Sequence, residues 1–344
     1  MLSPLFHAWE RRLASAATNR VVRPFEWGLE WVDAHPSGDD PPDARLDAYV
    51  RSVLGNTKEY YTPPPTDTYR LENGNGGTGV LTFASSRLTP HPENNTVFAR
   101  YFPGRSRRAG ERVRRAVVIL PQWNSDPNGH VGLARLIAST GITALRLSLP
   151  YHDERMPPEL SRADYIVSSN VARTLEVCRQ AVHDTRRAVW WLRDQGYERI
   201  GILGTSLGSC LAMLAGAHEP LIRALALNHI SPYFADVVWH GLSTRHVREG
   251  LDGHITLDVL RRLWMPISPL FFLDRLRDRR TLLVYARYDL TFPVDLSREL
   301  IAEFRRRQIP HQTIALPCGH YSTGVAPFKF LDGYVLTRFL HQNL

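Results

Sequence analysis

Short apolar runs alternate with helix-length segments over the last two thirds of the chain. We predict buried strands at these runs, which span residues 116–120, 142–149, 199–203, 224–229, 281–286 and 311–315. Near-continuous runs of Val, Ile and Leu that alternate with helices are typical of a parallel sheet covered by helices on both faces. The chain is therefore predicted to be an α/β protein with a mostly parallel, doubly wound sheet.

The region before these runs has a different pattern. Shorter segments at 69–71, 80–83 and 97–102 are joined by turns rich in Gly and Asn, which predicts an antiparallel edge of the sheet. Residues 1–65 have helical periodicity, and prolines at 63–65 separate them from the rest of the chain. We expect an N-terminal helical extension over 1–65 and one main domain over 66–344. The apolar stripe of the first helix consists of Leu2, Leu5, Phe6, Trp9 and Leu13.

One connection is much longer than the others. Between the predicted strands at 224–229 and 281–286, residues 231–280 carry Trp, Leu and Phe at helical spacing. In open α/β sheets, ligands bind outside the carboxyl ends of the strands. We therefore expect a helical lid inserted over 231–280, beside a site at that edge.

Charge and cysteine content narrow the function classes. The formal net charge of +8 comes from Arg residues dispersed along the chain, which does not indicate a nucleic-acid partner. No stretch approaches the roughly 20 apolar residues that cross a bilayer. The three cysteines cannot all pair and lack metal-ligand spacing, which fits a reducing compartment. Because the N-terminus is also unlike a secretory signal, we expect a cytoplasmic protein without a metal site, cofactor or integral membrane segment.

A Gly-Thr-Ser-Leu-Gly motif over 204–208 follows one predicted strand and precedes a helix pattern. In that context a G-x-S-x-G sequence is typical of a nucleophile elbow, a sharp strand-to-helix turn that exposes the serine hydroxyl. Gly204 and Gly208 are expected where a side chain would collide with the neighbouring strand and helix. The helix after Ser206 directs unpaired N–H groups toward an oxyanion beside the hydroxyl. Ser206 is therefore the candidate nucleophile.

A serine nucleophile needs a base and a carboxylate that orients the base. Asp289 lies in the turn after the predicted strand at 281–286, and His320 lies in the loop after the strand at 311–315. Loops that follow parallel strands lie at the same edge of a sheet. We therefore expect Asp289 and His320 to be the acid and the base that serve Ser206.

Other residues compete for these two roles. Asp236, which follows the preceding strand, is the alternative acid, and Asp289 could simply cap its turn. His311 and His341 are the alternative bases, although packing or surface roles explain them better.

From about Thr66 to the C-terminus, the chain resembles the α/β-hydrolase superfamily of serine hydrolases. The order Ser206, Asp289, His320 is the superfamily's order of nucleophile, acid and base. The Asp-x-x-x-Pro at 289–293 and the Gly-His at 319–320 also resemble the dienelactone-hydrolase-like and prolyl-oligopeptidase-like branches. The resemblance implies an α/β-hydrolase fold with a Ser-His-Asp triad.

The resemblance also implies an oxyanion hole made of two backbone N–H groups. One comes from Leu207, and the other comes from the loop after the predicted strand at 116–120. Superfamily members often carry His-Gly in that loop, whereas this chain has Pro-Gln-Trp-Asn over 121–124. We expect Trp123 to supply the second N–H, with Gln122 as the second choice.

Two further loops at this edge could contact a substrate. One is the charged loop over 150–157, and the other is the beginning of the expected lid. Structural roles at the rim, at a hinge or in the core are the alternative for every residue named here. The candidates are His152, Asp153, Arg155, His229, Tyr233 and Trp239.

These features together predict a serine hydrolase that cleaves a carboxylic ester or related acyl bond of a small molecule through an acyl-enzyme. A peptidase, an amidase or an acyltransferase could use the same triad, because the fate of the acyl-enzyme depends on the acceptor. A non-catalytic binding protein on the same scaffold is the alternative from another class.

Overall fold

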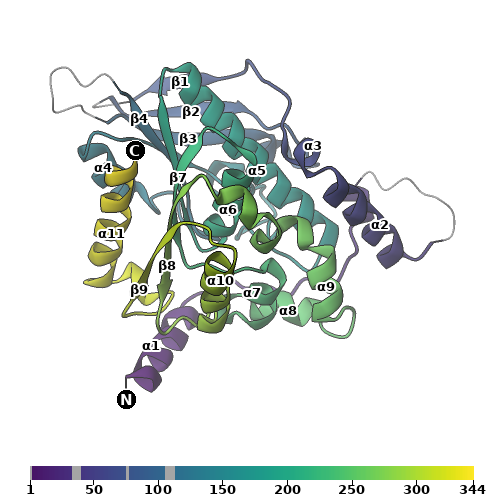
Figure 1. Ribbon diagram of the computed structural model, residues 1–344. Coiled ribbons are helices and arrows are strands. Elements are labelled where there is room, and N and C mark those ends of the chain that lie inside the picture. The colour runs from purple at the N-terminus through teal and green to yellow at the C-terminus, as the bar shows by residue number, and fades with distance from the viewer. Residues whose placement is uncertain (1, 33–39, 75–76, 105–112) are drawn as a thin grey trace.

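The computed structural model describes residues 2–32, 40–74, 77–104 and 113–344, and within them the chain forms a sheet of nine strands (Figure 1). The strand order is β1-β2-β3-β5-β4-β6-β7-β8-β9. β1, β2, β3 and β5 pair antiparallel, whereas β5, β4, β6, β7, β8 and β9 pair parallel. The strands are β1 (Arg70–Asn73), β2 (Gly79–Ala84), β3 (Thr96–Phe102), β4 (Arg115–Leu120), β5 (Thr143–Leu147), β6 (Arg199–Thr205), β7 (Ile222–Asn228), β8 (Arg280–Ala286) and β9 (His311–Leu316). The predicted mostly parallel sheet with an antiparallel edge is confirmed.

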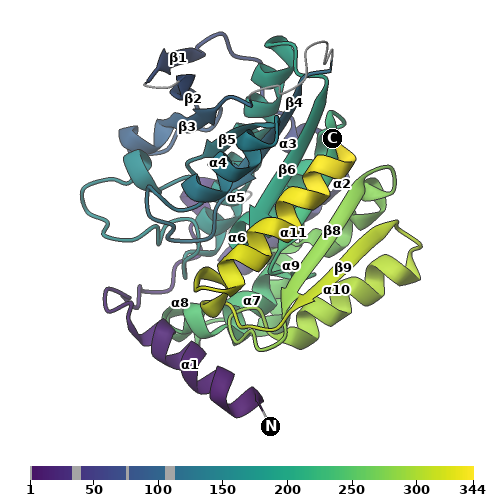
Figure 2. The ribbon, with the colours of Figure 1, turned by 90° about the vertical axis from the view of Figure 1, so that its left-hand side faces the viewer.

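Helices cover both faces of the sheet. α4 (Val131–Ser139) and α11 (Phe328–Asn343) cross one face, while α5 (Val171–Asp194), α6 (Leu207–His218) and α10 (Val294–Arg306) lie against the other (Figure 2). The side chains of β4 pack alternately on the two faces of the sheet. Val117 and Ile119 pack in the core under α4 and α11, whereas Val118 and Leu120 pack in the opposite core. Side chains alternate along a strand, so a strand buried on both sides must be apolar throughout.

Short helices fill the long connection between β7 and β8. They are α7 (Phe234–His240), η5 (Leu242–Thr244), α8 (Arg245–Leu251), α9 (Leu257–Leu263), η6 (Met265–Ile267) and η7 (Pro269–Leu276). Leu260, Leu263 and Trp264 are fully buried, so this segment packs firmly on the domain. Three further short helices lie in other connections: η3 (Pro92–Asn95), η4 (Asp153–Arg155) and η8 (Ser322–Gly324). In the described ranges, no helix is both long and apolar enough to cross a bilayer.

The N-terminal region is helical, as its periodicity predicts. It contains α1 (Ser3–Ser15), η1 (Leu29–Trp31), α2 (Pro42–Gly55) and α3 (Thr57–Tyr61). Leu46 and Val50 of α2 are fully buried, but Leu2 and Leu5 of α1 are exposed, and α1 buries Glu10 instead. Phe6, Trp9 and Leu13 of the stripe are partly buried, and Phe6 packs against the main domain, so α1 docks through part of the stripe together with Glu10.

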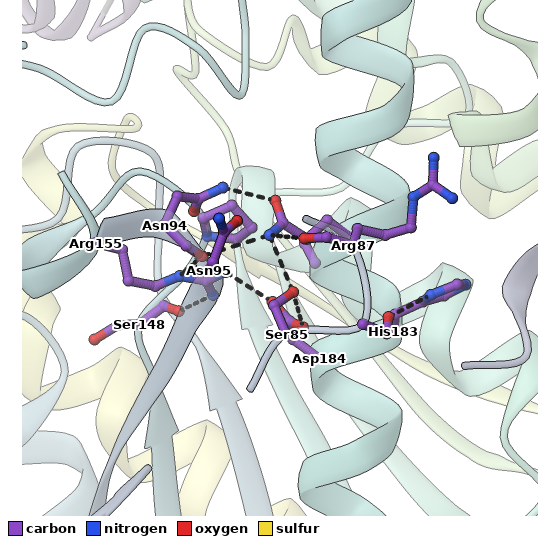
Figure 3. Close-up of polar contacts among 12 residues, drawn as sticks. Ser85, Arg87, Asn94, Asn95, Ser148, Arg155, His183 and Asp184 are labelled. Carbon is purple, nitrogen blue, oxygen red and sulfur yellow. Dashed lines mark hydrogen bonds and ion pairs between the residues drawn. The ribbon is translucent and has the colours of Figure 1, made fainter. Parts of the chain in front are cut away.

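A buried polar network joins α5 to the loops around β3 and β5 (Figure 3). Fully buried Arg155 forms an ion pair with Asp184 of α5, with an N···O distance of 2.9 Å, and donates to the backbone oxygens of Asn94 and Ser148. Ser85 Oγ donates to the other carboxylate oxygen of Asp184 at 2.8 Å. This placement corrects the expectation that Arg155 contacts a substrate. Its charge is used inside the protein to neutralise a buried carboxylate.

Replacing Arg155 by Met should lower the free energy of unfolding by about 3 to 5 kcal/mol, because Asp184 would stay buried without its cation. Urea denaturation measures this loss. The control is Arg193→Met on α5, the helix that carries Asp184, where both partners of the Arg193–Asp194 ion pair are about half exposed. Such surface pairs contribute about 1 kcal/mol or less. Equal losses in the two variants would show that the Arg155–Asp184 pair does not stabilise the fold.

His183 of α5 gives the fold a dependence on pH. It is buried, its Nε2–H donates to the backbone oxygen of Tyr60 at 2.7 Å, and its Nδ1 accepts from Ser86 Oγ at 2.8 Å. Burial, followed by the charge of Arg179, lowers the pKa of His183 from 6.5 to about 3. The unfolded chain therefore binds a proton between these values that the folded chain does not.

The contribution of His183 to stability is complete above pH 6.5 and is lost as pH falls from there toward 3. Over that interval the free energy of unfolding should decrease by about 1.4 kcal/mol per pH unit for this histidine. Urea denaturation of the wild type and His183→Gln between pH 8 and pH 5 should give the variant a shallower decrease. His341→Gln, at an exposed position on α11, serves as the control. Identical slopes for the wild type and His183→Gln would contradict this account.

Candidate functional site

Ser206 occupies the turn between β6 and α6, with the unusual backbone angles φ 58° and ψ −120°. A Cβ on Gly204 would lie 2.2 Å from the backbone oxygen of Gly208, and one on Gly208 would lie 2.2 Å from that of Leu120. The two glycines therefore let α6 approach both its own strand and the end of β4, as the motif predicts. α6 begins at Leu207, so its N-terminal dipole points to the side of Ser206.

Asp289 and His320 come together at the same edge of the sheet. Asp289 follows β8 and His320 follows β9, and Asp289 Oδ2 lies 3.0 Å from His320 Nδ1. The other carboxylate oxygen, Oδ1, accepts backbone N–H bonds from Thr291 at 2.8 Å and Phe292 at 2.7 Å. These bonds fix the orientation of the Asp289 carboxylate, which leaves Nε2 of His320 as the atom able to exchange a proton.

A second histidine shares the same carboxylate oxygen. His229 directly follows β7, has φ 57°, and its Nδ1 lies 2.7 Å from Asp289 Oδ2. Burial by itself would raise the pKa of Asp289, but the charge of His320 and the hydrogen bonds from His229 and His320 hold that pKa well below its usual range. The carboxylate therefore stays ionised, flanked by two imidazole rings whose centroids are 4.2 Å apart. The sequence suggested His229 only as a pocket residue, and its position directly after a strand was the one available signal.

By residue type, His229, Asp289 and His320 could also hold a cation, because one donor atom from each lies within 4.8 Å of the others. Both imidazole Nδ1 atoms are directed at Asp289 Oδ2, which is the geometry of hydrogen bonds to a carboxylate. Hydrogen bonding therefore accounts for the cluster.

The competing residues lie elsewhere. Asp236 is buried in α7 and pairs with Arg261, whose Nε is 2.9 Å from Asp236 Oδ2. His311 Nδ1 lies 2.7 Å from the backbone oxygen of Ile309 at the start of β9, and His341 is exposed on α11. Asp289 and His320 therefore remain the pair that the structure brings together.

The loop after β4 reaches the cavity on which Ser206 lies. Gln122 and Trp123 line the same cavity as Ser206 and Leu207. The Trp123 ring donates from Nε1 to the backbone oxygen of Ala163 at 2.8 Å, which fixes the side chain. The choice between Trp123 and Gln122 as an N–H donor stays a prediction.

His152 forms a hydrogen bond with the backbone of this loop. Its Nε2 accepts the backbone N–H of Asn124 at 2.9 Å, and its Nδ1–H donates to the backbone oxygen of Pro150 at 2.9 Å. Burial lowers the pKa of His152 to about 4, so the ring is neutral at physiological pH. The sequence suggested substrate contact for His152, whereas the structure gives it a role in fixing the backbone beside Trp123.

The cavity has a volume of about 1040 Å³ and contains both Ser206 and His320 on its wall. Phe234, Val237 and Val238 of α7 give it an apolar side. Among the residues that the sequence suggested for substrate contact, only His229 lines the cavity in the part of the chain that the structure describes. Asp153 is instead paired with Arg146 and bonded to Ser148. Tyr233 and Trp239 lie under the guanidinium groups of Arg261 and Arg248, respectively.

The wall formed by α11 contributes a carboxylate that the sequence did not reveal. Asp332 Oδ1 accepts from Asn228 Nδ2 at 3.0 Å, and both residues line the cavity. Burial raises the pKa of Asp332 to about 6. Lys329 and Phe330 of α11 line the cavity as well, so this wall is of mixed character, in contrast to the apolar wall formed by α7.

α1 contacts the loops that carry Asp289 and His320. The Glu10 carboxylate accepts the backbone N–H groups of Tyr321 at 2.8 Å and Ser322 at 2.9 Å, directly after His320. Phe6 stacks on Tyr288, the residue before Asp289, with the ring centroids 4.4 Å apart. No motif near Glu10 predicts this role, because its partners lie more than 300 positions away along the chain.

Comparison with known proteins gives a likeness in structure only. No model of a protein family matches the chain, and no curated protein sequence matches it. The acetyl xylan esterase from Paenibacillus sp. R4 aligns with a TM-score of 0.60 at 14% identity, covering 92% of this chain and 99% of that one. Acetyl xylan esterase 1 from Thermoanaerobacterium sp. JW/SL YS485 aligns with a TM-score of 0.58 at 13% identity, covering 96% and 98% of the two chains.

A peptidase is similar to the same extent. The acylaminoacyl peptidase from Pyrococcus horikoshii aligns with a TM-score of 0.60 at 15% identity over 86% of this chain. The alignment covers 43% of that peptidase, so this chain corresponds to less than half of its length. Identities this low establish a shared fold without a shared substrate. From its sheet, its helical layers and these likenesses, we conclude that the chain has the α/β-hydrolase fold.

Proposed function

We propose that the protein is a serine hydrolase that cleaves a carboxylic ester of a small molecule, with Ser206 as nucleophile, His320 as base and Asp289 as the acid that orients His320. The observation that carries this proposal is the pairing of Asp289 and His320, 3.0 Å apart, on the cavity where the strained turn presents Ser206. Hydrolase activity in general is also supported by the esterases and the peptidase that share the fold.

In the proposed reaction, Ser206 Oγ attacks the carbonyl carbon while His320 Nε2 takes its proton. The ionised Asp289 stabilises the imidazolium that forms. The tetrahedral oxyanion is bound by the backbone N–H of Leu207 and one from Trp123 or Gln122, and each such donor contributes about 10²- to 10³-fold to kcat. His320 then returns the proton to the leaving alcohol, and a water molecule cleaves the acyl-enzyme by the same steps in reverse.

We further propose that α7 and the helices after it act as a lid over the acyl side of the site. Phe234, Val237 and Val238 give the cavity an apolar wall from this segment, which favours an acyl or aromatic group over a sugar-like one. Hydrolysis of a peptide bond is the second candidate, because the acylaminoacyl peptidase and a Mycobacterium tuberculosis puromycin-hydrolyzing peptidase share the fold.

Replacing Ser206 by Ala should abolish labelling by a fluorophosphonate probe and lower kcat for p-nitrophenyl acetate by about 10⁶-fold, the order of loss expected when such a serine is removed. Gel fluorescence and absorbance assays measure the two effects. Ser243→Ala, which changes another serine on the cavity wall, is the matched control and should label as the wild type does. Labelling or turnover that survives in Ser206→Ala would refute the assignment of Ser206 as nucleophile. A wild-type protein that is not labelled by the probe and hydrolyses no ester would favour a binding protein.

The preference for esters over amides is tested by comparing kcat/KM for one substrate of each kind. Wild-type kcat/KM should be higher for p-nitrophenyl acetate than for N-acetylalanine p-nitroanilide, even after the difference in chemical reactivity is corrected by the uncatalysed rates. A corrected preference for the anilide would make the protein a peptidase that uses the same residues.

Replacing Glu10 by Ala should lower kcat by up to about 100-fold with little change in KM, because the loop that carries His320 would lose two backbone hydrogen bonds and shift the imidazole. Glu10→Gln, which keeps one acceptor oxygen, should restore part of the rate. Steady-state kinetics give the split between kcat and KM, and thermal melting shows that each variant is folded. Arg11→Ala, at an exposed position of α1, is the control, and equal kcat values in the Glu10→Ala and Arg11→Ala proteins would show that Glu10 does not position His320.

A further inference from the structure

Arginines from two distant segments meet on the cavity wall. Arg20 comes from the chain after α1, and Arg162 comes from the loop between β5 and α5. Arg20 Nη2 donates to the hydroxyl of Tyr321 at 3.1 Å, next to His320. The guanidinium of Arg162 lies 5.3 Å from the ring centroid of Trp123, in the loop expected to complete the oxyanion hole. Both cations therefore lie beside residues that flank Ser206.

The positive charge in this cluster is not fully compensated. Asp164 is the shared partner of Arg23, at 3.3 Å, and of Arg162, at 3.4 Å. Among the residues that the structure describes, Arg20 forms no ion pair, and its buried Nε has no acceptor. Glu10 adds a second negative charge at the same loop, where its two oxygens each accept a backbone N–H, so three arginines face two carboxylates in this cluster.

The pKa of a neighbouring histidine responds to the same positive charges. His246 stacks on Trp123 with the ring planes 4° apart, and it is buried. Burial, followed by the charges of Arg162, Arg20 and Arg23, lowers the pKa of His246 to about 4. The imidazole is thus neutral at physiological pH and does not add a further cation to the cluster.

We propose that Arg20 and Arg162 bind an anionic group of the substrate, a carboxylate or a phosphate, beside the bond that is cleaved. Guanidinium groups bind such oxyanions through charge-assisted, often bidentate hydrogen bonds. Arg20 is only partly buried, but it has no counterion among the described residues, and an anionic ligand would supply one.

This inference rests on the proposed hydrolase activity and deepens it, because it names the charge of the substrate. The competing explanation is that the arginines only anchor the N-terminal segment, since Arg162 Nη1 donates to Asn19 Oδ1 at 3.2 Å. Anchoring affects all substrates alike, whereas anion binding affects only the charged ones. Pairs of esters that differ only in charge therefore separate the two explanations.

The test compares kcat/KM within such pairs. On the alcohol side, 4-acetoxybenzoate and 4-acetoxyphenyl phosphate are compared with neutral p-tolyl acetate, and on the acyl side monomethyl adipate is compared with methyl hexanoate. In at least one pair, the wild type should prefer the anionic ester by about tenfold or more. Arg20→Gln and Arg162→Gln should lower kcat/KM on the preferred anionic ester about tenfold more than on its neutral counterpart. The benzoate and phosphate arms show which anion is bound.

Arg11→Gln, which removes an exposed cation of α1, controls for general electrostatic attraction and should keep the preference. The inference is overturned if the wild type has no preference for any anionic ester, or if the Arg20 and Arg162 variants lower the rates on charged and neutral esters equally. Calorimetric binding of 4-acetoxybenzoate to Ser206→Ala protein, with and without Arg20→Gln, tests the site without turnover. Loss of affinity on adding Arg20→Gln would support anion binding even if the hydrolase proposal failed.

Discussion

The close contact between the start of α6 and the end of β4 is the constraint on which the site depends. Gly204 and Gly208 permit it, because any side chain at either position would overlap backbone oxygens. This contact places Ser206 beside the loop that follows β4, and the parallel order of β7, β8 and β9 brings His229, Asp289 and His320 to the same edge. A larger residue at either glycine would move α6 away from β4 and separate the serine from every group gathered there.

Asp289 is the second element of this arrangement, because it joins loops that follow three different strands. Its Oδ2 faces both His229 and His320, while Oδ1 is bound to the backbone of its own turn. A carboxylate with all its bonds satisfied in one orientation cannot rotate freely. His229 thus limits the positions that Asp289 can take, and through Asp289 it limits those of His320.

The strands, their order along the chain and the acid and base loops could be predicted because each is encoded locally. Apolar runs such as 116–120 report burial on both sides of a strand, and the glycine spacing around Ser206 reports a tight turn. What failed were inferences that depend on a distant partner. Arg155 looked like a residue at the rim, but Asp184 draws it into the interior, and α1 docks partly through Glu10, which bonds to the loop after His320, while Leu2 and Leu5 stay exposed. A charge along a sequence does not reveal whether its counterion lies in solvent or in the core.

The bond between Glu10 and the loop after His320 joins residues more than 300 positions apart. During synthesis α1 emerges before its docking surface, which exists only after β8, β9 and the loops that follow them have folded. Contacts of such long range form late, since they must overcome the entropy of closing a large loop. The bond between Glu10 and this loop is therefore expected to form late in folding, and a partly synthesised chain carries Ser206 without His320, the candidate base.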